Sequence, residues 1–274
     1  MIAAIRGDDK TGKTSLILTF PKPLFHMDFD VGGFNRASHR FRQEIKDGLV
    51  VSKSYHIPQQ SLRSRMGLDK AAFGMSQTNK VVGIKELWYQ MLTDYIEVLE
   101  GVKLAPNGEK FRTVAMDPFP QVWDICTTTV LQEKQERQKS GERLREQLLQ
   151  IEYGEPNQRL RAILHAAREV GMHLALGHFM VDEFGKRLVK DKLEDVVVGK
   201  KAAGWKYIRK EADLEVTTEF RSITNNGSGP TTTPFGTVTL CGLALGPEGH
   251  EIMEPTFDQL VQLVSVYRDG PLES

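Results

Sequence analysis

The first fifteen residues read Met1-Ile2-Ala3-Ala4-Ile5-Arg6 and then Gly7-Asp8-Asp9-Lys10-Thr11-Gly12-Lys13-Thr14-Ser15. The first six have the pattern of a short apolar strand, and the next nine match the phosphate-binding pattern G-x-x-x-x-G-K-[ST] in full. Glycines let the backbone of such a loop curl so that its N–H groups point at phosphate oxygens, and the helix that follows adds its dipole. The stretch therefore predicts a strand, a loop and a helix that bind a nucleoside triphosphate.

The loop also predicts separate roles for its polar residues. We expect Lys13 to reach the β- and γ-phosphates as a point charge and the Thr14 hydroxyl to ligate the Mg²⁺ that bridges them. The whole loop is the predicted nucleotide-binding segment: Gly7, Asp8, Asp9, Lys10, Thr11, Gly12, Lys13, Thr14 and Ser15.

Length and composition favour one soluble α/β domain over residues 1–274, with 40% hydrophobic and 26% charged residues. The apolar runs are too short to span a bilayer. The loop starts at residue 7, which leaves no room for a leader peptide, and Cys126 and Cys241 lack paired spacing. These features predict a reducing, cytoplasmic location. Lys plus Arg and Asp plus Glu are equal at 36 each, so global charge gives no argument for nucleic acid.

Two further strands are predicted to end in acids. Residues 24–30 form the second strand, with Asp28 and Asp30 at its end, and residues 111–117 form a buried third strand that closes on Asp117. Ligands of open α/β sheets lie at the carboxyl ends of the strands. We therefore predict that Asp117, together with Thr14, holds Mg²⁺, with Asp28 as the rival candidate and a solvated strand end as the alternative for Asp28 and Asp30.

The middle of the chain is less regular. Residues 34–80 carry many Arg and Lys residues without clean periodicity, which predicts an exposed basic insertion. Helical spacing predicts helices over 82–99, from about 122, and over 156–170. The polar stretch 133–139 is expected to project into solvent, with a subunit or partner contact as the alternative. The strand 172–178 ends on His178, which is either a sensor of the γ-phosphate or a histidine at the edge of the core.

The C-terminal third predicts an antiparallel extension. We expect an edge strand at 186–190, a basic loop over 200–206, and an antiparallel pair, 212–222 with 237–245, joined by a flexible connection at 225–230. A last helix over 256–268 completes a β-hairpin plus helix unit at about 212–270.

This order of elements resembles the RecA-like ATPase domains of bacteriophage genomes, often called phage AAA-type ATPases, one branch of which resembles single-strand annealing recombination proteins. The residues that carry the resemblance are the phosphate loop, the Asp-x-Gly-Gly end of the second strand, Asp117 and His178. The likeness covers residues 1 to about 245.

The resemblance implies a RecA-like P-loop fold: a mainly parallel sheet, helices on both faces, and the His178 strand between the loop strand and the Asp117 strand. It implies ATP and Mg²⁺ as cofactors and an acid that activates water, which by position is Asp30. The family's usual base is glutamate, so the shorter Asp30 implies a backbone that lies closer to the γ-phosphate, slow hydrolysis, or a different base. It further implies a homo-oligomer, a ring or a filament, in which a neighbour supplies a cation, with Lys206, Arg209 and Lys210 as candidates.

The leading hypothesis is an ATPase of phage recombination or replication that acts on single-stranded DNA in the host cytoplasm. Basic residues between Arg36 and Arg65, with His39, Phe41 and Tyr55 as stacking surfaces, support DNA binding. One alternative is a small-molecule or nucleotide kinase, disfavoured by the late third strand and the C-terminal pair. The other is a nucleotide-dependent switch that hydrolyses little, supported by aspartate in place of glutamate.

Overall fold

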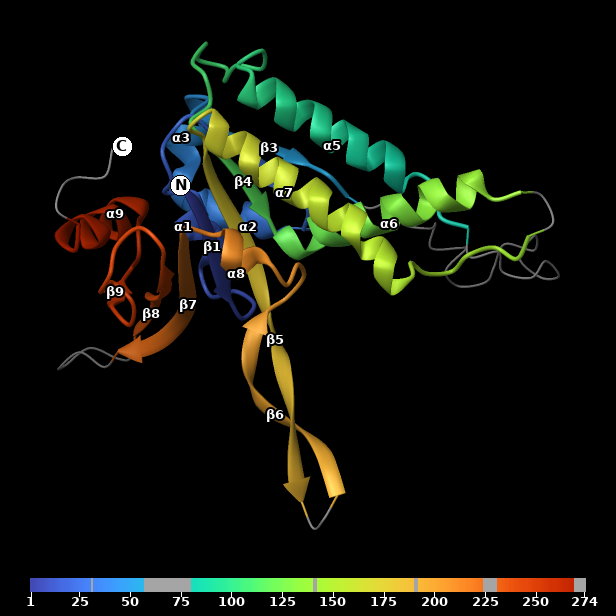
Figure 1. The fold of residues 1–274 in the computed structure, drawn as a ribbon. Coiled ribbons are helices and arrows are strands. Elements are labelled where there is room, and N and C mark those ends of the chain that lie inside the picture. Colours follow the sequence, from blue (N-terminus) through green and yellow to red (C-terminus); the bar gives the residue numbers. More distant parts are fainter. Residues whose placement is uncertain (31, 57–79, 140–141, 190–191, 224–230, 269–274) are drawn as a thin grey trace.

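A central β-sheet organises the part of the chain that the computed structural model describes, residues 1–30, 32–56, 80–139, 142–189, 192–223 and 231–268 (Figure 1). Its strands follow the spatial order β3-β2-β4-β5-β1-β7-β8-β9, and β6 pairs with β5 outside this path. The strands are β1 (Ile2–Gly7), β2 (Leu24–Asp28), β3 (Val50–Ser54), β4 (Thr113–Asp117), β5 (His173–Val189), β6 (Lys192–Ala202), β7 (Leu214–Ile223), β8 (Thr231–Cys241) and β9 (Glu251–Met253).

The sheet is parallel from β3 through β7 and antiparallel from β7 to β9. Strand β5 lies between β1 and β4, and each neighbour runs parallel to it. This confirms the mixed α/β fold with a mainly parallel sheet and a C-terminal antiparallel extension. The carboxyl ends of β1, β2 and β4 consequently meet at one edge of the sheet, where ligands of parallel sheets bind.

Helices cover both faces of the sheet. The helices are α1 (Lys13–Ile17), α2 (Gly33–Ser38), α3 (Arg42–Lys46), α5 (Ile84–Leu99), α6 (Phe119–Arg137), α7 (Gly154–Glu169), α8 (Ile208–Glu211) and α9 (Phe257–Val266), with 3₁₀ turns at His39–Phe41 and Gln150–Tyr153. On one face, α5, α6 and α7 bury Trp88, Phe119 and Leu160 against the sheet, and on the other α1 and α9 bury Leu16 and Phe257 (Figure 1). Each such side chain contributes about 1.5–3 kcal/mol of transfer free energy.

Strand β5 continues past the sheet into a long arm. From Met180 onward it pairs antiparallel with β6, and the two strands project away from the body of the fold (Figure 1). The sequence indicated an edge strand at 186–190 followed by a basic loop, and it missed β6. An arm with little core beneath it leaves apolar residues such as Phe184 and Val197 more than half exposed, so the inside–outside pattern of a strand is weak there.

The segment 34–56 is more ordered than its composition indicates. It forms α2, α3 and the edge strand β3, which pairs parallel with β2. Tyr55, expected as a stacking surface for nucleic acid, is fully buried and donates its hydroxyl to Asp94 at 2.7 Å. That expectation is therefore wrong for Tyr55. Arg63 and Arg65 of the same basic stretch lie outside the described residues, as does the connection at 225–230.

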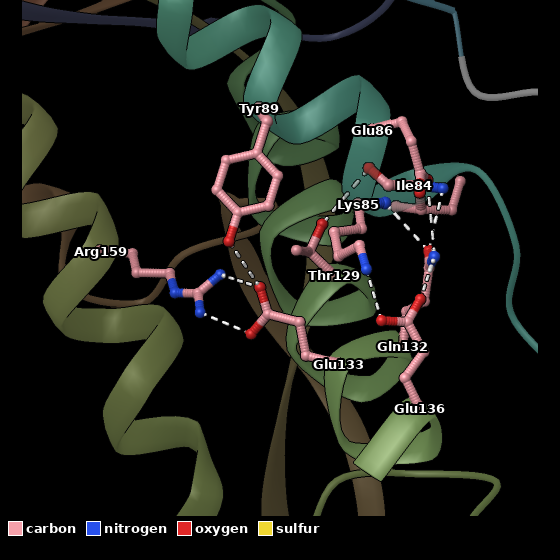
Figure 2. Close-up of polar contacts among 9 residues, drawn as sticks. All are labelled: Ile84, Lys85, Glu86, Tyr89, Thr129, Gln132, Glu133, Glu136 and Arg159. Atoms are coloured by element: carbon pink, nitrogen blue, oxygen red, sulfur yellow. Dashed lines mark hydrogen bonds and ion pairs between the residues drawn. The ribbon is translucent and has the colours of Figure 1, made fainter.

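The polar end of α6 begins with buried side chains, which corrects the expectation of solvent projection for Glu133 and Gln135, whereas Glu136 and Arg137 are exposed as expected. The Gln132 amide oxygen accepts hydrogen bonds from the backbone N–H groups of Ile84 and Lys85 (Figure 2). These two groups lie at the start of α5, where backbone N–H groups have no acceptor within the helix. Glu133 accepts two hydrogen bonds from Arg159 of α7 and one from Tyr89 of α5 (Figure 2). These polar side chains are buried because they bind the three helices to one another.

Replacing Glu133 by alanine is expected to destabilise the protein by about 3 kcal/mol, because Arg159 loses its most buried carboxylate partner. Burial acts to raise the pKa of Glu133, yet Arg159 and Tyr89 outweigh it and leave that pKa lowered. Urea unfolding of the two proteins measures the difference. The matched control is Glu136→Ala on the same helix, whose ion pair with Lys85 is more exposed and should cost under about 1 kcal/mol. Equal costs for the two variants would contradict this account.

Candidate functional site

The loop between β1 and α1 has the tight conformation that its glycines predict. The backbone φ is 88° at Gly12 and 62° at Lys10. The left-handed region is open to glycine at little cost, whereas a lysine enters it only where the surrounding structure enforces it, as in functional loops. A Cβ atom on Gly7 would lie 2.4 Å from Thr11 Oγ1 and 2.5 Å from the Thr218 carbonyl oxygen, so the close turn needs glycine at that position too.

Lys13 begins α1 and folds back over the loop. Its Nζ donates to the carbonyl oxygens of Gly7 at 3.0 Å and Asp8 at 2.6 Å. Burial lowers the pKa of the Lys13 ammonium, against the opposing effect of four nearby carboxylates, the largest being that of Asp117. The loop thus places one ammonium between the end of β1 and the end of β4.

Asp117 lies where the sequence predicts it, at the last residue of β4 and beside the loop. Thr14 Oγ1 donates to Asp117 Oδ2 at 2.6 Å. Burial acts to raise the pKa of Asp117, but His26, Thr14 and Lys13 outweigh it and leave the pKa lowered. The carboxylate is therefore held ionised next to the hydroxyl that the loop presents.

Gly177 of β5 makes room for that carboxylate, and sequence reasoning missed it. A Cβ atom on Gly177 would lie 2.1 Å from Asp117 Oδ1 and 3.2 Å from Ile17 of α1. The signal was a glycine inside an otherwise apolar strand, which often marks the close approach of another group.

Asp28 and Asp30 both face the same cavity. Asp28 pairs in register with Asp117 on the neighbouring strand, and its Oδ1 accepts the backbone N–H of Asp30 at 3.1 Å. Burial is the largest cause that raises the pKa of Asp28, and the Asp117 charge adds to it. Asp30 is about half exposed, with its carboxylate 3.8 Å from Arg36. The strand end is therefore not simply solvated.

We expect Asp28→Asn to raise the melting temperature of the nucleotide-free protein by roughly 2 °C at pH 7. A carboxyl whose folded pKa is raised costs stability when ionised, and asparagine removes that cost while keeping an oxygen for the Asp30 N–H. The gain should disappear as the pH falls below the ordinary aspartate pKa of about 4, because both states are then protonated. Thermal melts from pH 3.5 to 8 measure this, and a gain that persists at the acid end contradicts the assignment.

An open cavity of about 570 Å³ joins these groups. Its lining brings together most of the predicted site: Asp9, Lys10, Thr11, Gly12, Lys13, Thr14, Ser15, Asp28, Asp30, Gly33, Arg36, Ala37, Asp117, Pro118, Gln121, Phe179 and Phe220. The volume lies in the range of small-molecule and cofactor sites.

His178 is not among these lining residues. It is fully buried on the opposite face of β5 from Gly177, where its ring packs against Phe119 with ring centroids 5.4 Å apart and its Nδ1 lies 3.2 Å from the Ala203 carbonyl oxygen. Burial lowers its pKa to about 4. A sensor role for His178 stays a prediction, and in this structure it would have to act through Phe119 or the strand rather than by touching a phosphate.

Two other segments contact the loop, and neither contact was predicted from the sequence. Lys200 at the base of the β5–β6 arm donates to both carboxylate oxygens of Asp8, at 2.6 and 2.8 Å. The Thr218 hydroxyl of β7 lies 3.0 Å from the Thr11 hydroxyl. The loop is thus held by hydrogen bonds from the β5–β6 arm and from β7, which flanks β1 on the side opposite to β5.

The donor set fits a magnesium ion shared with phosphates. The described residues hold no group of three or more His, Cys, Asp or Glu side chains that forms a metal cage by itself. Mg²⁺ commonly takes one or two carboxylates, with phosphates and water completing its shell, and prefers oxygen ligands. Thr14 and Asp117, already in contact, match that requirement.

A phosphate loop after β1, an acid-ended strand two places away, and one strand between them define a P-loop nucleotide-binding protein. A family model described as an AAA domain matches residues 1–213, so the chain belongs to that family of AAA-type P-loop ATPases. ATPases of this type generally use ATP and Mg²⁺. No curated protein shows a significant match to the sequence. Within the described residues, none of the helices is both long and apolar enough to cross a membrane.

Proposed function

We propose that the chain binds ATP with Mg²⁺ in the cavity of the phosphate loop and hydrolyses it. The observation that carries the proposal is the contact between Thr14 and Asp117 at 2.6 Å, with Lys13 of the same loop beside them. A loop hydroxyl and a strand-end carboxylate, the two kinds of side chain that hold Mg²⁺ in P-loop proteins, are thus already in contact.

In this proposal Lys13 leaves the carbonyl oxygens of Gly7 and Asp8 and binds the β- and γ-phosphates, while loop N–H groups bind the remaining phosphate oxygens. Thr14 and Asp117 would hold Mg²⁺, which when bound draws negative charge from the transferred phosphoryl group. Lys13 would stabilise the same charge with its ammonium.

We further propose Asp30 as the group that orients the attacking water. It lines the cavity, is half exposed to solvent, and has one cation, Arg36, at 3.8 Å. A base must lie within hydrogen-bond reach of the water, and aspartate is one methylene shorter than the usual glutamate. Slow turnover is therefore expected, and Asp30→Asn should lower it further without weakening ATP binding.

We propose single-stranded DNA as the polymer on which this ATPase acts, as in the phage RecA-like proteins that the sequence resembles. A second cavity of about 240 Å³ supports the proposal, with Trp123, Tyr153 and Lys206 in its lining. Aromatic faces beside a cation are what single-stranded nucleic acids bind through stacking and phosphate contacts. The same basic segment carries Arg209 and Lys210, which together with Lys206 are the proposed candidates for the trans-acting cation of a ring or filament of identical subunits.

Phosphate release from ATP, with and without single-stranded DNA, tests this function. We expect slow basal release that DNA stimulates and that Lys13→Ala abolishes. Lys206→Glu, in the lining of the second cavity, should remove the stimulation by DNA. Lys46→Glu on α3 should retain it, which would assign DNA binding to the second cavity and not to the basic residues of segment 34–56. Transfer of phosphate to a small acceptor would instead favour a kinase, and tight binding without turnover would favour a switch.

A further inference from the structure

His26 is a buried imidazole next to the proposed metal site with one ring nitrogen unused. The residue lies in β2, is fully buried, and its Nε2 has no hydrogen-bond partner among the described residues. An unsatisfied buried polar atom costs about 1–3 kcal/mol, so such an atom calls for a reason. Its position supplies one, because Nε2 lies 3.9 Å from Asp117 Oδ2.

The other contacts of the ring fix its orientation. Nδ1 lies 3.1 Å from the Ser52 hydroxyl oxygen on β3, and the ring stacks on Phe34, with centroids 4.9 Å apart and planes 30° apart. When the Ser52 hydroxyl donates to Nδ1, the neutral ring carries its hydrogen on Nε2. That hydrogen then points toward the carboxylate of Asp117.

We propose that His26 is a positioning residue for Asp117, and that its Nε2–H donates to Oδ2 when the Mg²⁺ site forms. The inference rests on the proposed function. In the present structure Thr14 holds Oδ2 at 2.6 Å, and a small turn of the carboxylate toward β2 closes the 3.9 Å gap to His26. Hydrogen bonds to a liganding group from the side away from the metal fix its orientation, and their loss commonly lowers metal affinity 10–100-fold.

Substitutions of matched reach test the role of Nε2. The amide nitrogen of glutamine reaches about as far as Nε2, whereas that of asparagine reaches only as far as Nδ1. We expect H26Q to keep its affinity for Mg²⁺ within about threefold, and H26N and H26F to weaken it about tenfold. The measurement is a Mg²⁺ titration of the binding of a fluorescent ATP analogue, which does not depend on hydrolysis. In excess chelator, the affinity of every variant for the analogue should lie within about twofold of the wild-type affinity measured in the same chelator.

The matched control is His173→Asn on the same sheet. His173 also has a buried ring nitrogen, Nδ1, without a partner among the described residues, but it packs on Phe257 of α9, away from Asp117. H173N should titrate with Mg²⁺ as the wild type does. If H26N does the same, the role of His26 is overturned while the proposed function stands. If the wild type binds no nucleotide with Mg²⁺, the proposed function fails and the role of His26 with it.

Nitrogen NMR of the wild-type protein gives a test that needs no variant. Addition of Mg²⁺ and a non-hydrolysable ATP analogue should leave His26 with its hydrogen on Nε2 and shift that resonance, while the resonances of His173 stay unchanged. A ring with its hydrogen on Nδ1, or an Nε2 resonance that does not move, would overturn the proposal.

Discussion

Gly177→Ala should lower ATP turnover at least about a hundredfold. The added Cβ atom would lie 2.1 Å from Asp117 Oδ1, so the carboxylate must move away from Thr14 or the strand must shift. A displacement of about 1 Å at a catalytic group can cost a hundredfold in rate. Overpacking of this kind also destabilises a protein by typically 1–3 kcal/mol, so the variant is expected to fold with a lower melting temperature.

The control for Gly177→Ala is Gly199→Ala in β6, where an added Cβ atom would meet no atom within 4 Å. Phosphate release and thermal melts are measured for both variants beside the wild type. Gly199→Ala should match the wild type in turnover. Wild-type turnover by folded Gly177→Ala protein would show that Asp117 need not stay where the structure places it.

Lys13→Ala should lower the rate of ATP hydrolysis and the affinity for ATP, each by about a hundredfold or more. The substitution removes the one ammonium of the loop that reaches from α1 across to the end of β1. The fold should persist, because among the described residues the hydrogen bonds of Lys13 go to two backbone carbonyl oxygens. Burial also lowers the pKa of its ammonium, so the charge is not a source of stability that alanine would remove.

Lys46→Ala on α3 is the matched control for Lys13→Ala, because Lys46 does not line the cavity. Circular dichroism confirms that each variant is folded, and phosphate release with nucleotide binding gives the effect. Retained turnover in Lys13→Ala would assign the activity to another site or to a contaminant.

The sequence was most informative where backbone geometry and chemistry coincide. The glycine pattern of residues 7–15 predicted a tight phosphate-binding loop. The apolar runs before Asp28 and Asp117 predicted strands that end at the cavity. The position of β5 between β1 and β4 followed from the family resemblance. Local patterns of this kind are readable because the residues of each element carry the hydrophobic periodicity and turn signals that specify it.

The features that the sequence did not predict depend on partners far along the chain. Glu133 can be buried because Arg159 neutralises its charge and Tyr89 donates a hydrogen bond to it. Tyr55 can be buried because Asp94 accepts a hydrogen bond from its hydroxyl. Gly177 is needed because the Asp117 carboxylate on β4 and, at a longer distance, Ile17 of α1 lie where its Cβ atom would be. Local polarity could not indicate these pairings, since tertiary contacts decide whether a polar side chain is buried.

Binding of ATP to the wild-type protein tests the central claim most directly. Equilibrium dialysis with labelled ATP and Mg²⁺ should give saturable binding of one nucleotide per chain, and chelation of Mg²⁺ should weaken it. Absence of saturable binding by folded protein would contradict the assignment of the cavity between Lys13, Thr14 and Asp117 as a nucleotide site.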